Sequence, residues 1–410
     1  MSSEVYWNNL PDHIIINILA FLPLTDRCNA ALCCRSWSEC FDNPTLWREF
    51  TFRFEDARDS IQLQCLTKHG RQLRVAKILC NQKQLANQQN ACAVLSGLAK
   101  CEERRLEEVT VQFTSENPLF FQGFEFLSSL AELFGPPDPK IKLVSTLTKV
   151  DLSGLFVTYQ PVLLQLLADN NPNLKELNIQ NTSLTCLIEP ECMLTVVTKC
   201  PMISSLSIHY RSTSEPLFLE LCDPKRKPLN FLSLACTREE KYHNAITGES
   251  WKMLIDRHKR LRVCIKFDHT IERHRILSIL QPEIPLVELQ MKTMTELYDE
   301  VSMVGRYYYK TLEYLSIVTK GTDELKRALL DLVEHSDRLH TLHCYCALDE
   351  DSIRRIRTLR PHLRKYTLKT EEEFNLLVPT LPDLRECLEN IWSNWKSSQR
   401  AMRGFGAPAS

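Results

Sequence analysis

Cysteine and histidine are the residues of this sequence with the clearest capacity for chemistry. The 410 residues include 17 cysteines and 11 histidines, and His340, His343, Cys344 and Cys346 lie close together. Thiolates and imidazoles are common zinc ligands. In a β-strand, however, successive side chains point to opposite faces, so Cys344 and Cys346 would face one way and His343 the other. We therefore interpret both cysteines as core residues and predict no metal site.

An enzyme acting by nucleophilic catalysis would need a cysteine or serine held beside a base and an orienting third group. The sequence contains no such motif, no glycine-rich phosphate loop and no Walker pattern, and it has only 10 glycines. With so many cysteines and histidines, some pair would approach by chance, so composition alone does not indicate catalysis. We predict that the chain is not an enzyme and binds no cofactor.

The charge and hydropathy of the chain also narrow its partners and its location. Lys and Arg number 50 against 51 Asp and Glu, so we expect neither nucleic acid nor an acidic membrane as a partner. We find no transmembrane run of about 18 apolar residues and no secretory signal. The cysteines then indicate a reducing compartment. We predict a cytoplasmic protein, with the nucleus as an alternative because residues 225–227 are basic.

A strongly apolar helix is predicted over residues 10–22, LPDHIIINILAFL. Pro11 suits a first helical turn, where a backbone N–H has no partner in any case. Ile14, Ile18 and Leu22 fall on one stripe, and further apolar residues fill most of the remaining circumference. A unit of about 40 residues cannot bury such a helix by itself. The segment therefore predicts a covering surface, either on the rest of this chain or on another protein.

The amino-terminal region also carries a long motif. It consists of Leu10-Pro11, the Ile/Leu run, Leu22-Pro23-Leu24, Asp26, Cys34-Arg35-Ser36-Trp37 and Leu46-Trp47. This motif resembles an F-box. The resemblance implies a three-helix unit over residues 4–50 that binds a Skp-family adaptor, and through it the cullin and RING subunits of an SCF-type ubiquitin ligase. The residues expected to bind the adaptor are Leu10, Pro11, Ile14, Ile15, Ile18, Leu22, Leu24, Cys34, Arg35, Trp37, Leu46 and Trp47.

A second pattern, Leu-x-x-Leu-x-Leu with allowed swaps, recurs from residue 73 to residue 368 and predicts the remaining fold. Its instances begin at Leu73, Leu106, Leu147, Leu174, Ile203, Leu229, Leu261 (degenerate), Leu286, Leu312, Leu339 and Leu363. Apolar residues at helical spacing lie between them, in residues 161–174, 250–261, 270–280, 323–339 and 351–363. Proline at positions 172, 201 and 361 ends such a helix just before the next strand.

Strand, turn and helix, repeated, predict an α/β fold in which a curved parallel sheet lines the inside of a solenoid and helices cover the outside. With the F-box ahead of it, this arrangement resembles the F-box/leucine-rich-repeat family. We expect an irregular leucine-rich-repeat solenoid of about 11 repeats over residues 51–381. A capping helix over 382–400 and a flexible tail over 401–410 would complete the chain.

The strand periodicity also predicts a binding surface, because the residues between the leucines point away from the core. We favour the carboxy-terminal half, where tyrosine and histidine, residue types that anchor interfaces, occur among them. The substrate-binding residues predicted there are Glu288, Gln290, Lys292, Tyr314, Ser316, Thr341, His343, Tyr345, Lys365, Thr367 and Lys369. The predicted function is recognition of a protein substrate for ubiquitination and degradation. The alternative is a non-degradative scaffold or inhibitor that sequesters its partner.

Overall fold

The structure is a computed structural model that describes residues 10–116, 122–136, 145–183, 186–237, 245–293, 295–370 and 372–373. The predicted capping helix over 382–400 and tail over 401–410 lie outside the described residues, as do the first residues of the expected F-box. Contacts divide the chain into two compact units, which are described separately. The first comprises residues 1–188 and 195–203, and the second comprises residues 189–194 and 204–410.

The expected F-box begins the first unit and is helical, as predicted. Its elements are α1 (Asp12–Phe21), α2 (Leu24–Ala31), α3 (Arg35–Phe41) and the 3-10 turn η2 (Pro44–Trp47). Prolines set their starts: Pro11 and Pro23 immediately precede α1 and α2, and Pro44 is the first residue of η2. Proline is suited to these positions because its ring fixes φ near the helical value and its missing N–H is not needed there.

Arg27, on α2, ties the helices of this region together. Its Nε donates to the carbonyl oxygen of Leu19 at 3.0 Å, and its Nη1 donates to that of Leu46 at 2.9 Å. The carbonyl of Leu22 accepts from Nη2 at 3.3 Å. One guanidinium thus donates to carbonyl groups at the end of α1 and in η2, where few backbone N–H groups are available to them. Burial lowers the pKa of Arg27 from its ordinary value.

A parallel sheet follows, with its strands in sequence order. The twelve strands are β1 (Glu49–Phe54), β2 (Val75–Cys80), β3 (Glu108–Phe113), β4 (Lys149–Gly154), β5 (Glu176–Asn178), β6 (Ser205–His209), β7 (Phe231–Cys236), β8 (Arg262–Phe267), β9 (Leu286–Met291), β10 (Tyr314–Val318), β11 (Thr341–Ala347) and β12 (Lys365–Lys369). Strands β2 to β12 correspond to the eleven instances of the sequence pattern. The predicted α/β repeat architecture is confirmed.

Strand β1 was not predicted, and it shows where the repeats begin. Its register pairs Phe50 with Ala76 and Phe52 with Ile78, so Trp47-x-x-Phe50-x-Phe52 is equivalent to the pattern that starts at Leu73. Aromatic residues replace the leucines in this first instance, so it does not match Leu-x-x-Leu-x-Leu. The expected domain boundary at residue 50 falls within β1, so the end of the F-box and the start of the sheet share residues.

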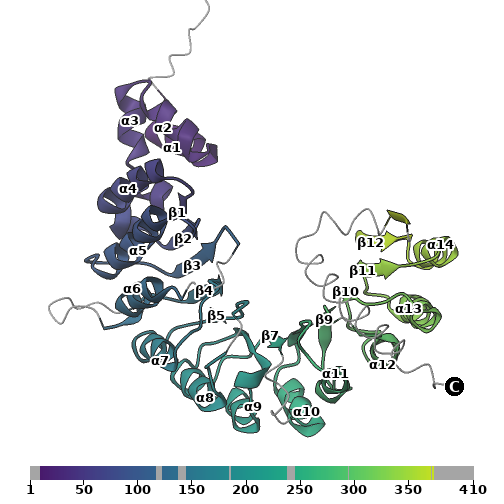
Figure 1. Cartoon of the computed structure of the whole chain (residues 1–410). Helices are drawn as coiled ribbons and strands as arrows, with labels where there is room; N and C mark the ends of the chain where they lie inside the picture. The colour runs from purple at the N-terminus through teal and green to yellow at the C-terminus, as the bar shows by residue number, and fades with distance from the viewer. Residues whose placement is uncertain are drawn as a thin grey trace, which may run out of the picture. The chain divides into compact units, whose positions relative to one another are not determined.

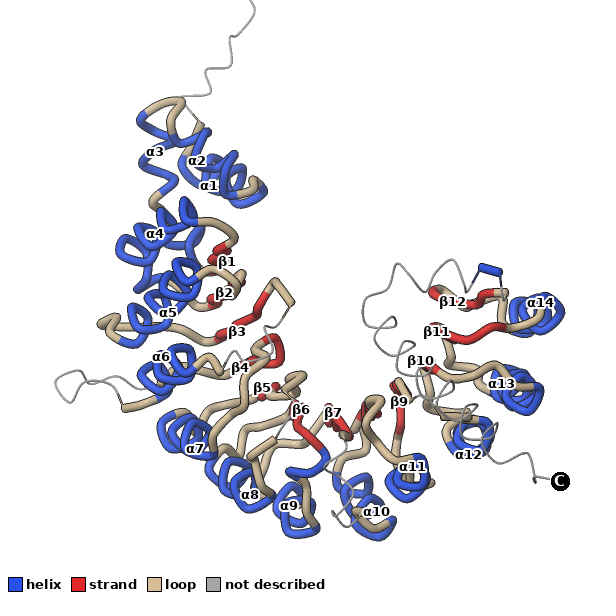
Figure 2. The backbone as a smooth tube through the Cα atoms, in the orientation of Figure 1, coloured by secondary structure: helices blue, strands red, loops and turns tan. Residues whose placement is uncertain are grey.

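The helices of the repeats lie on one side of the strands in each unit (Figures 1 and 2). The first unit has α4 (Gln62–His69), α5 (Leu85–Ala99), α6 (Phe124–Phe134) and α7 (Pro161–Asn170), and α8 (Pro190–Lys199) has residues in both units. The second unit has α9 (Glu215–Leu221), α10 (Gly248–Arg257), α11 (Arg273–Ile279), α12 (Tyr298–Tyr307), α13 (Asp323–His335) and α14 (Glu350–Leu359). The five helices predicted from residues 161–363 all form, and α7, α8 and α14 end just before the three prolines, as expected.

The core of each repeat lies between the strands and these helices. In the second unit, Leu315 pairs in register with Leu289 on one side and Leu342 on the other, and all three side chains are fully buried. Burying one leucine side chain stabilises a fold by about 1.5–3 kcal/mol, so this row stabilises β10 against both of its neighbouring strands. Among the described residues, no helix combines the length and apolarity required to span a bilayer.

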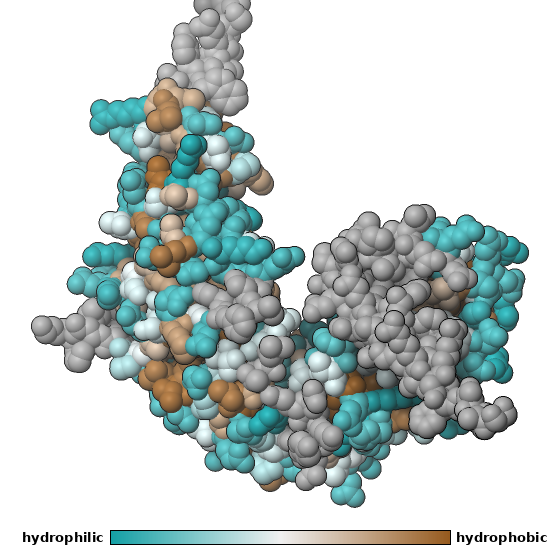
Figure 3. Space-filling model, viewed as in Figure 1, coloured by the Kyte–Doolittle hydropathy of each residue, from teal (hydrophilic) through white to brown (hydrophobic). Residues whose placement is uncertain are grey.

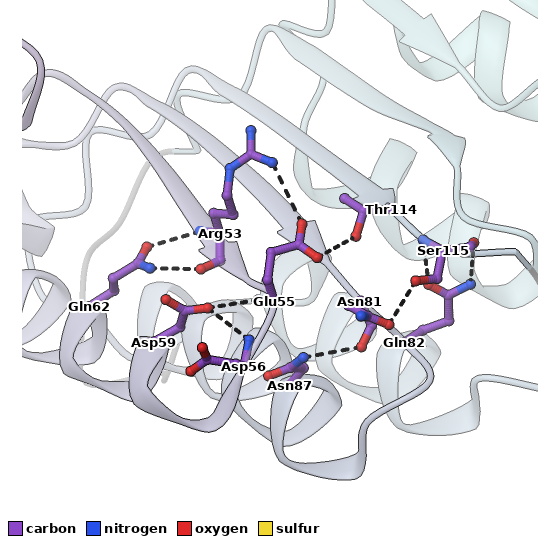
Figure 4. Close-up of polar contacts among 10 residues, drawn as sticks. All are labelled: Arg53, Glu55, Asp56, Asp59, Gln62, Asn81, Gln82, Asn87, Thr114 and Ser115. Carbon is purple, nitrogen blue, oxygen red and sulfur yellow. Dashed lines mark hydrogen bonds and ion pairs between the residues drawn. The ribbon is translucent and has the colours of Figure 1, made fainter.

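Polar side chains connect the first repeats at the carboxyl ends of their strands (Figure 4). Thr114 Oγ1 donates to Glu55 Oε2 at 3.3 Å, and Ser115 Oγ donates to Asn81 Oδ1 at 2.8 Å. Arg53 forms an ion pair with Glu55 at 3.6 Å. Residues that follow β1, β2 and β3 are thereby fixed to one another, which holds the strand ends in register.

Candidate functional site

The helix α1 presents two apolar faces, and only one of them is covered. Ile15 and Leu19 are fully buried, whereas Ile14 is 38% exposed and Phe21 is 90% exposed. Ile14, Ile18 and Phe21 follow the i, i+4, i+7 spacing of a single helical stripe. The sequence-based expectation that this helix needs a covering surface therefore applies to that stripe.

Further exposed apolar residues lie on and after α2. This helix buries none of its side chains, and Leu24 at its start is 38% exposed. Leu32, which follows its last residue, is 84% exposed. Figure 3 shows hydrophobic residues among hydrophilic ones on the visible surface of the chain, including the region of these first helices. We call Ile14, Ile18, Phe21, Leu24 and Leu32 the apolar helix surface.

Three residues predicted to bind the adaptor do not reach the surface. Ile15 is fully buried, and Leu46 and Trp47 are 6% and 3% exposed. The Trp47 indole N–H donates to the carbonyl oxygen of Phe41 at 2.7 Å, and its ring stacks on His69 with centroids 3.9 Å apart. Trp47 packs inward because it starts the first repeat, which corrects its expected role: these three residues hold the unit together.

The other predicted adaptor-binding residues differ in exposure. Pro11 and Arg35 are exposed, and Arg35 forms an ion pair with Glu39 one helical turn away at 2.8 Å. The half-buried ones are Leu10, Ile18, Leu22, Cys34 and Trp37. Sequence reasoning omitted Phe21 and Leu32 from the contact residues. Their signal was present: Phe21 completes the stripe of Ile14, and Leu32 is an apolar residue at the end of a polar helix.

The second predicted surface is the face of the sheet that the helices leave uncovered, over strands β9–β12. The register aligns its residues in rows across these strands. One row contains Glu288, Tyr314, Thr341 and Lys365, and the next contains Gln290, Ser316, His343 and Thr367. Lys292 follows β9, Tyr345 pairs with Val318, and Lys369 pairs with Ala347. Parallel pairing in register thus brings the predicted residues together, and we call this surface the β9–β12 face.

Aromatic rings form the centre of the β9–β12 face. The ring of His343 lies 5.7 Å from that of Tyr314 and 6.1 Å from that of Tyr345, the latter at an interplanar angle of 16°. His343 Nδ1 and Thr367 Oγ1 share a hydrogen bond of 2.9 Å. The face therefore presents three rings in fixed orientations.

Electrostatics distinguishes the centre of this face from its edges. Burial lowers the pKa of His343 from its usual value of 6.5, and the nearby charge of Lys365 lowers it further. Burial raises the pKa of Tyr314. Lys292 and Lys365 are exposed at the edges. The rings of His343 and Tyr314 are consequently uncharged near neutral pH, and the charged residues around them are mostly positive.

Two predicted substrate-binding residues offer little surface. Ser316 is 3% exposed and Thr341 is 4% exposed. Both are small side chains between larger ones in their rows, which explains why a residue on the predicted face can still be buried. They support the neighbouring rings and contribute little contact area themselves.

Cys344 and Cys346 lie in the core, as the strand periodicity predicted. They are 0% and 1% exposed, with sulfur atoms 3.2 Å apart. The hydrogen bond to Cys346 and burial raise the pKa of Cys344 well above its ordinary value. In the described part of the chain, no three His, Cys, Asp or Glu side chains come close enough to hold a metal ion.

Comparisons with known proteins agree with this arrangement. The F-box-like family matches residues 7–53. The chain is 26% identical over 376 residues to F-box/LRR-repeat protein 8 of Homo sapiens, covering 91% of this chain and 98% of the relative. It is 24% identical over 354 residues to F-box/LRR-repeat protein 21 of Bos taurus, covering 82% and 76%.

The two regions of the structure correspond to these two findings. The family match covers α1 to η2 and most of β1, while the relatives extend over the repeats as well. An F-box-like amino-terminal region, a parallel sheet built from repeats and similarity to F-box/LRR-repeat protein 8 over 91% of the chain support an F-box/leucine-rich-repeat family assignment.

Proposed function

We propose that this chain is a substrate-recognition subunit of an SCF-type ubiquitin ligase. The F-box binds a Skp-family adaptor, which connects it to a cullin and a RING subunit, and the repeats bind the protein substrate. The chain catalyses nothing itself: it raises the effective concentration of a substrate lysine near the conjugating enzyme. Its F-box/leucine-rich-repeat relatives support a role as a substrate-recognition adaptor. We place this activity in the cytoplasm or the nucleus.

The observation that carries the proposal is the apolar helix surface of the F-box. Phe21 and Leu32 leave nearly all of their side-chain surface in solvent, while the neighbouring helix face is fully packed. An exposed apolar patch on an otherwise well-packed protein is typical of a site for another protein. We assign the adaptor to this surface, together with Leu10, Pro11, Leu22, Cys34, Arg35 and Trp37 at its borders.

The test is co-purification with a Skp-family adaptor. Phe21→Ala combined with Leu32→Ala should weaken the complex by at least about tenfold, since truncation of a hot-spot residue at the centre of an interface costs about 2 kcal/mol or more. Phe124→Ala is the matched control, because Phe124 is 63% exposed on α6 of the same unit. Undiminished adaptor binding by the double variant would contradict the proposal.

The substrate-binding part of the proposal rests on the β9–β12 face. Tyr314, His343 and Tyr345 form its centre, and Glu288, Gln290, Lys292, Lys365, Thr367 and Lys369 surround them. Tyr345→Ala should reduce capture of ubiquitinated substrate by the intact ligase. Tyr307→Ala is the control, because Tyr307 is also exposed but lies on helix α12. If both variants lost the same amount of substrate capture, the β9–β12 face would not be the substrate-binding surface.

A scaffold or inhibitor would use the same repeats without degradation. The half-life of a partner captured by the repeats separates the two functions. A degraded substrate persists longer when Phe21 and Leu32 are replaced, since the adaptor is no longer recruited. The partner of a scaffold shows the same half-life with either form of the chain.

A further inference from the structure

A second charged site lies in the first unit, away from both surfaces above. A cavity of about 370 Å³ opens among the segments that precede strands β1, β2 and β3. Four arginines line it, Arg48, Arg71, Arg74 and Arg105, with Glu103 the only acidic residue in the lining. Four positive charges against one negative charge give the lining a formal charge of +3.

The backbone of the repeats fixes this grouping. The carbonyl oxygen of Arg48 accepts hydrogen bonds from the N–H groups of Arg74 and Val75, at 2.8 and 2.9 Å. The carbonyl oxygen of Arg74 accepts in the same way from the residues that begin the next repeat, Glu107 and Glu108. Arg48 and Arg74 are therefore equivalent positions one strand spacing, about 4.8 Å, apart. Parallel pairing holds their side chains side by side.

The four arginines differ in how far their charges are already compensated. Arg74 forms an ion pair with Glu107, and Arg71 forms a long, exposed one with Glu102 at 3.7 Å. Within the described residues, the side chains of Arg48 and Arg105 have no carboxylate within ion-pair distance, and both are exposed. Two uncompensated guanidinium groups thus border the same cavity, and their mutual repulsion would be relieved by an anion between them.

We propose that this arginine pocket binds a phosphoryl group. A guanidinium presents several N–H donors in a planar fork that matches the oxygen atoms of phosphate, and each fork can bind in a bidentate manner. Arg74 keeps donors available because Glu107 occupies only its Nη1. The cavity volume is within the usual range of small-ligand sites, which leaves room for the phosphoryl group and part of the molecule that carries it.

The position of the pocket gives the bound group a structural effect. Arg48 follows directly after η2, the last element of the F-box, while Arg71 and Arg74 precede the second strand and Arg105 precedes the third. An anion held by all of them would connect the end of the F-box to the first repeats. Ligand binding to the folded form would then stabilise the first unit. This site is independent of the adaptor and substrate surfaces.

The test is calorimetric titration of the full-length chain at constant ionic strength with two probes, inorganic phosphate and the tripeptide Gly-phosphoserine-Gly. Saturable binding is expected for at least one of them. The double variant Arg48→Gln with Arg105→Gln should weaken it by about a hundredfold, since each hydrogen-bonded charged group contributes roughly a factor of ten or more. The double variant Arg48→Lys with Arg105→Lys keeps the charge but loses the planar fork of donors. Its affinity for the probe should lie between that of the unmodified chain and that of the glutamine variant.

The matched control is Arg53→Gln with Arg58→Gln. It removes the same charge from exposed positions of the first unit that do not line the pocket. Binding unchanged in this control and lost in the pocket variant supports the proposal, and an unaltered circular dichroism spectrum shows that the pocket variant is folded. Equal weakening of binding in the pocket variant and in this control would show that only general charge attracts the probe, and would overturn the proposal. The proposal would also be overturned if neither probe bound to the unmodified chain.

The two probes identify the source of the phosphoryl group. Tighter binding of the phosphopeptide by about tenfold or more indicates a phosphorylated protein, because contacts to the peptide then add to those with the phosphate. Equal affinity for inorganic phosphate indicates a free phosphate compound. Both results support an arginine pocket for phosphoryl groups, and they distinguish a phosphorylated protein from a free phosphate compound as its ligand.

Discussion

Helices α2 and α13 show how the F-box and the repeats differ in the burial of their helices. α13 packs against α12 and α14 and buries Leu325, Ala328, Leu329, Leu332 and Val333. α2 packs chiefly against α3 and buries none of its side chains. Successive repeats supply the neighbours of α13 on both sides, as expected for a helix inside a repeat array. The F-box contains no such succession, so the apolar helix surface stays exposed.

The largest expected effect separates these two kinds of apolar residue. Leu329→Ala should lower the free energy of unfolding of the second unit by about 2–5 kcal/mol, the usual cost of a cavity in a packed core. Phe21→Ala should change the stability of the free chain by less than about 0.5 kcal/mol, because Phe21 is exposed. Urea denaturation followed by tryptophan fluorescence measures both, and similar losses would remove the distinction between the two regions.

The junction between the regions should respond to Trp47. Trp47→Phe keeps an aromatic ring against His69 but removes the hydrogen bond to the carbonyl oxygen of Phe41. We expect the free energy of unfolding to fall by about 1–3 kcal/mol, because the half-buried carbonyl of Phe41 is left without this donor. Hydrogen exchange should accelerate in residues 41–54 and remain unchanged in β9–β12. Faster exchange throughout the chain would mean that the F-box and the repeats unfold as one unit.

Acid should weaken the same junction. Burial lowers the pKa of His69 below its usual value of 6.5, although the charge of Asp42 opposes this. The unfolded chain therefore binds more protons than the folded one as the pH falls below 6.5, and stability decreases in that direction while staying complete above it. His69→Phe keeps a ring against Trp47 and cannot titrate, so its stability should vary less between pH 7.5 and pH 5.5. An identical pH profile in the variant and the parent would contradict this role of His69.

The smallest effect concerns the histidine of the β9–β12 face, where the neighbouring charge has the opposite sign. Burial and then Lys365 lower the pKa of His343. Lys365→Gln should raise the pKa of His343 toward 6.5, as measured by a proton NMR titration of the imidazole signals. Lys292→Gln is the control, since Lys292 is not among the charges that shift this histidine. A shift caused by both variants would indicate a general field over the face.

The repeat pattern predicted eleven of the twelve strands because the leucine spacing is set by side-chain alternation and helix length, which are local properties of the chain. The exception is instructive. Trp47, Phe50 and Phe52 have the same spacing with aromatic residues, but Trp47 and Phe50 fall within the F-box predicted over residues 4–50, whose motif ends in Leu46-Trp47. Trp47 thus belongs to both the F-box motif and the repeat pattern. Its stacking on His69 shows that it packs as the first residue of a repeat.

The sequence by itself therefore determined the class of fold, the F-box resemblance and the side of each strand on which a residue lies. Tertiary structure decided which of those residues are accessible: Ile15 and Trp47 are buried by segments that follow them, Ser316 lies between larger neighbours, and Phe21 remains exposed. It also brought Arg48, Arg74 and Arg105 together from three successive repeats. Periodicity is a property of neighbouring residues, whereas accessibility and charge clusters depend on segments far apart in the sequence, and only packing brings these into contact.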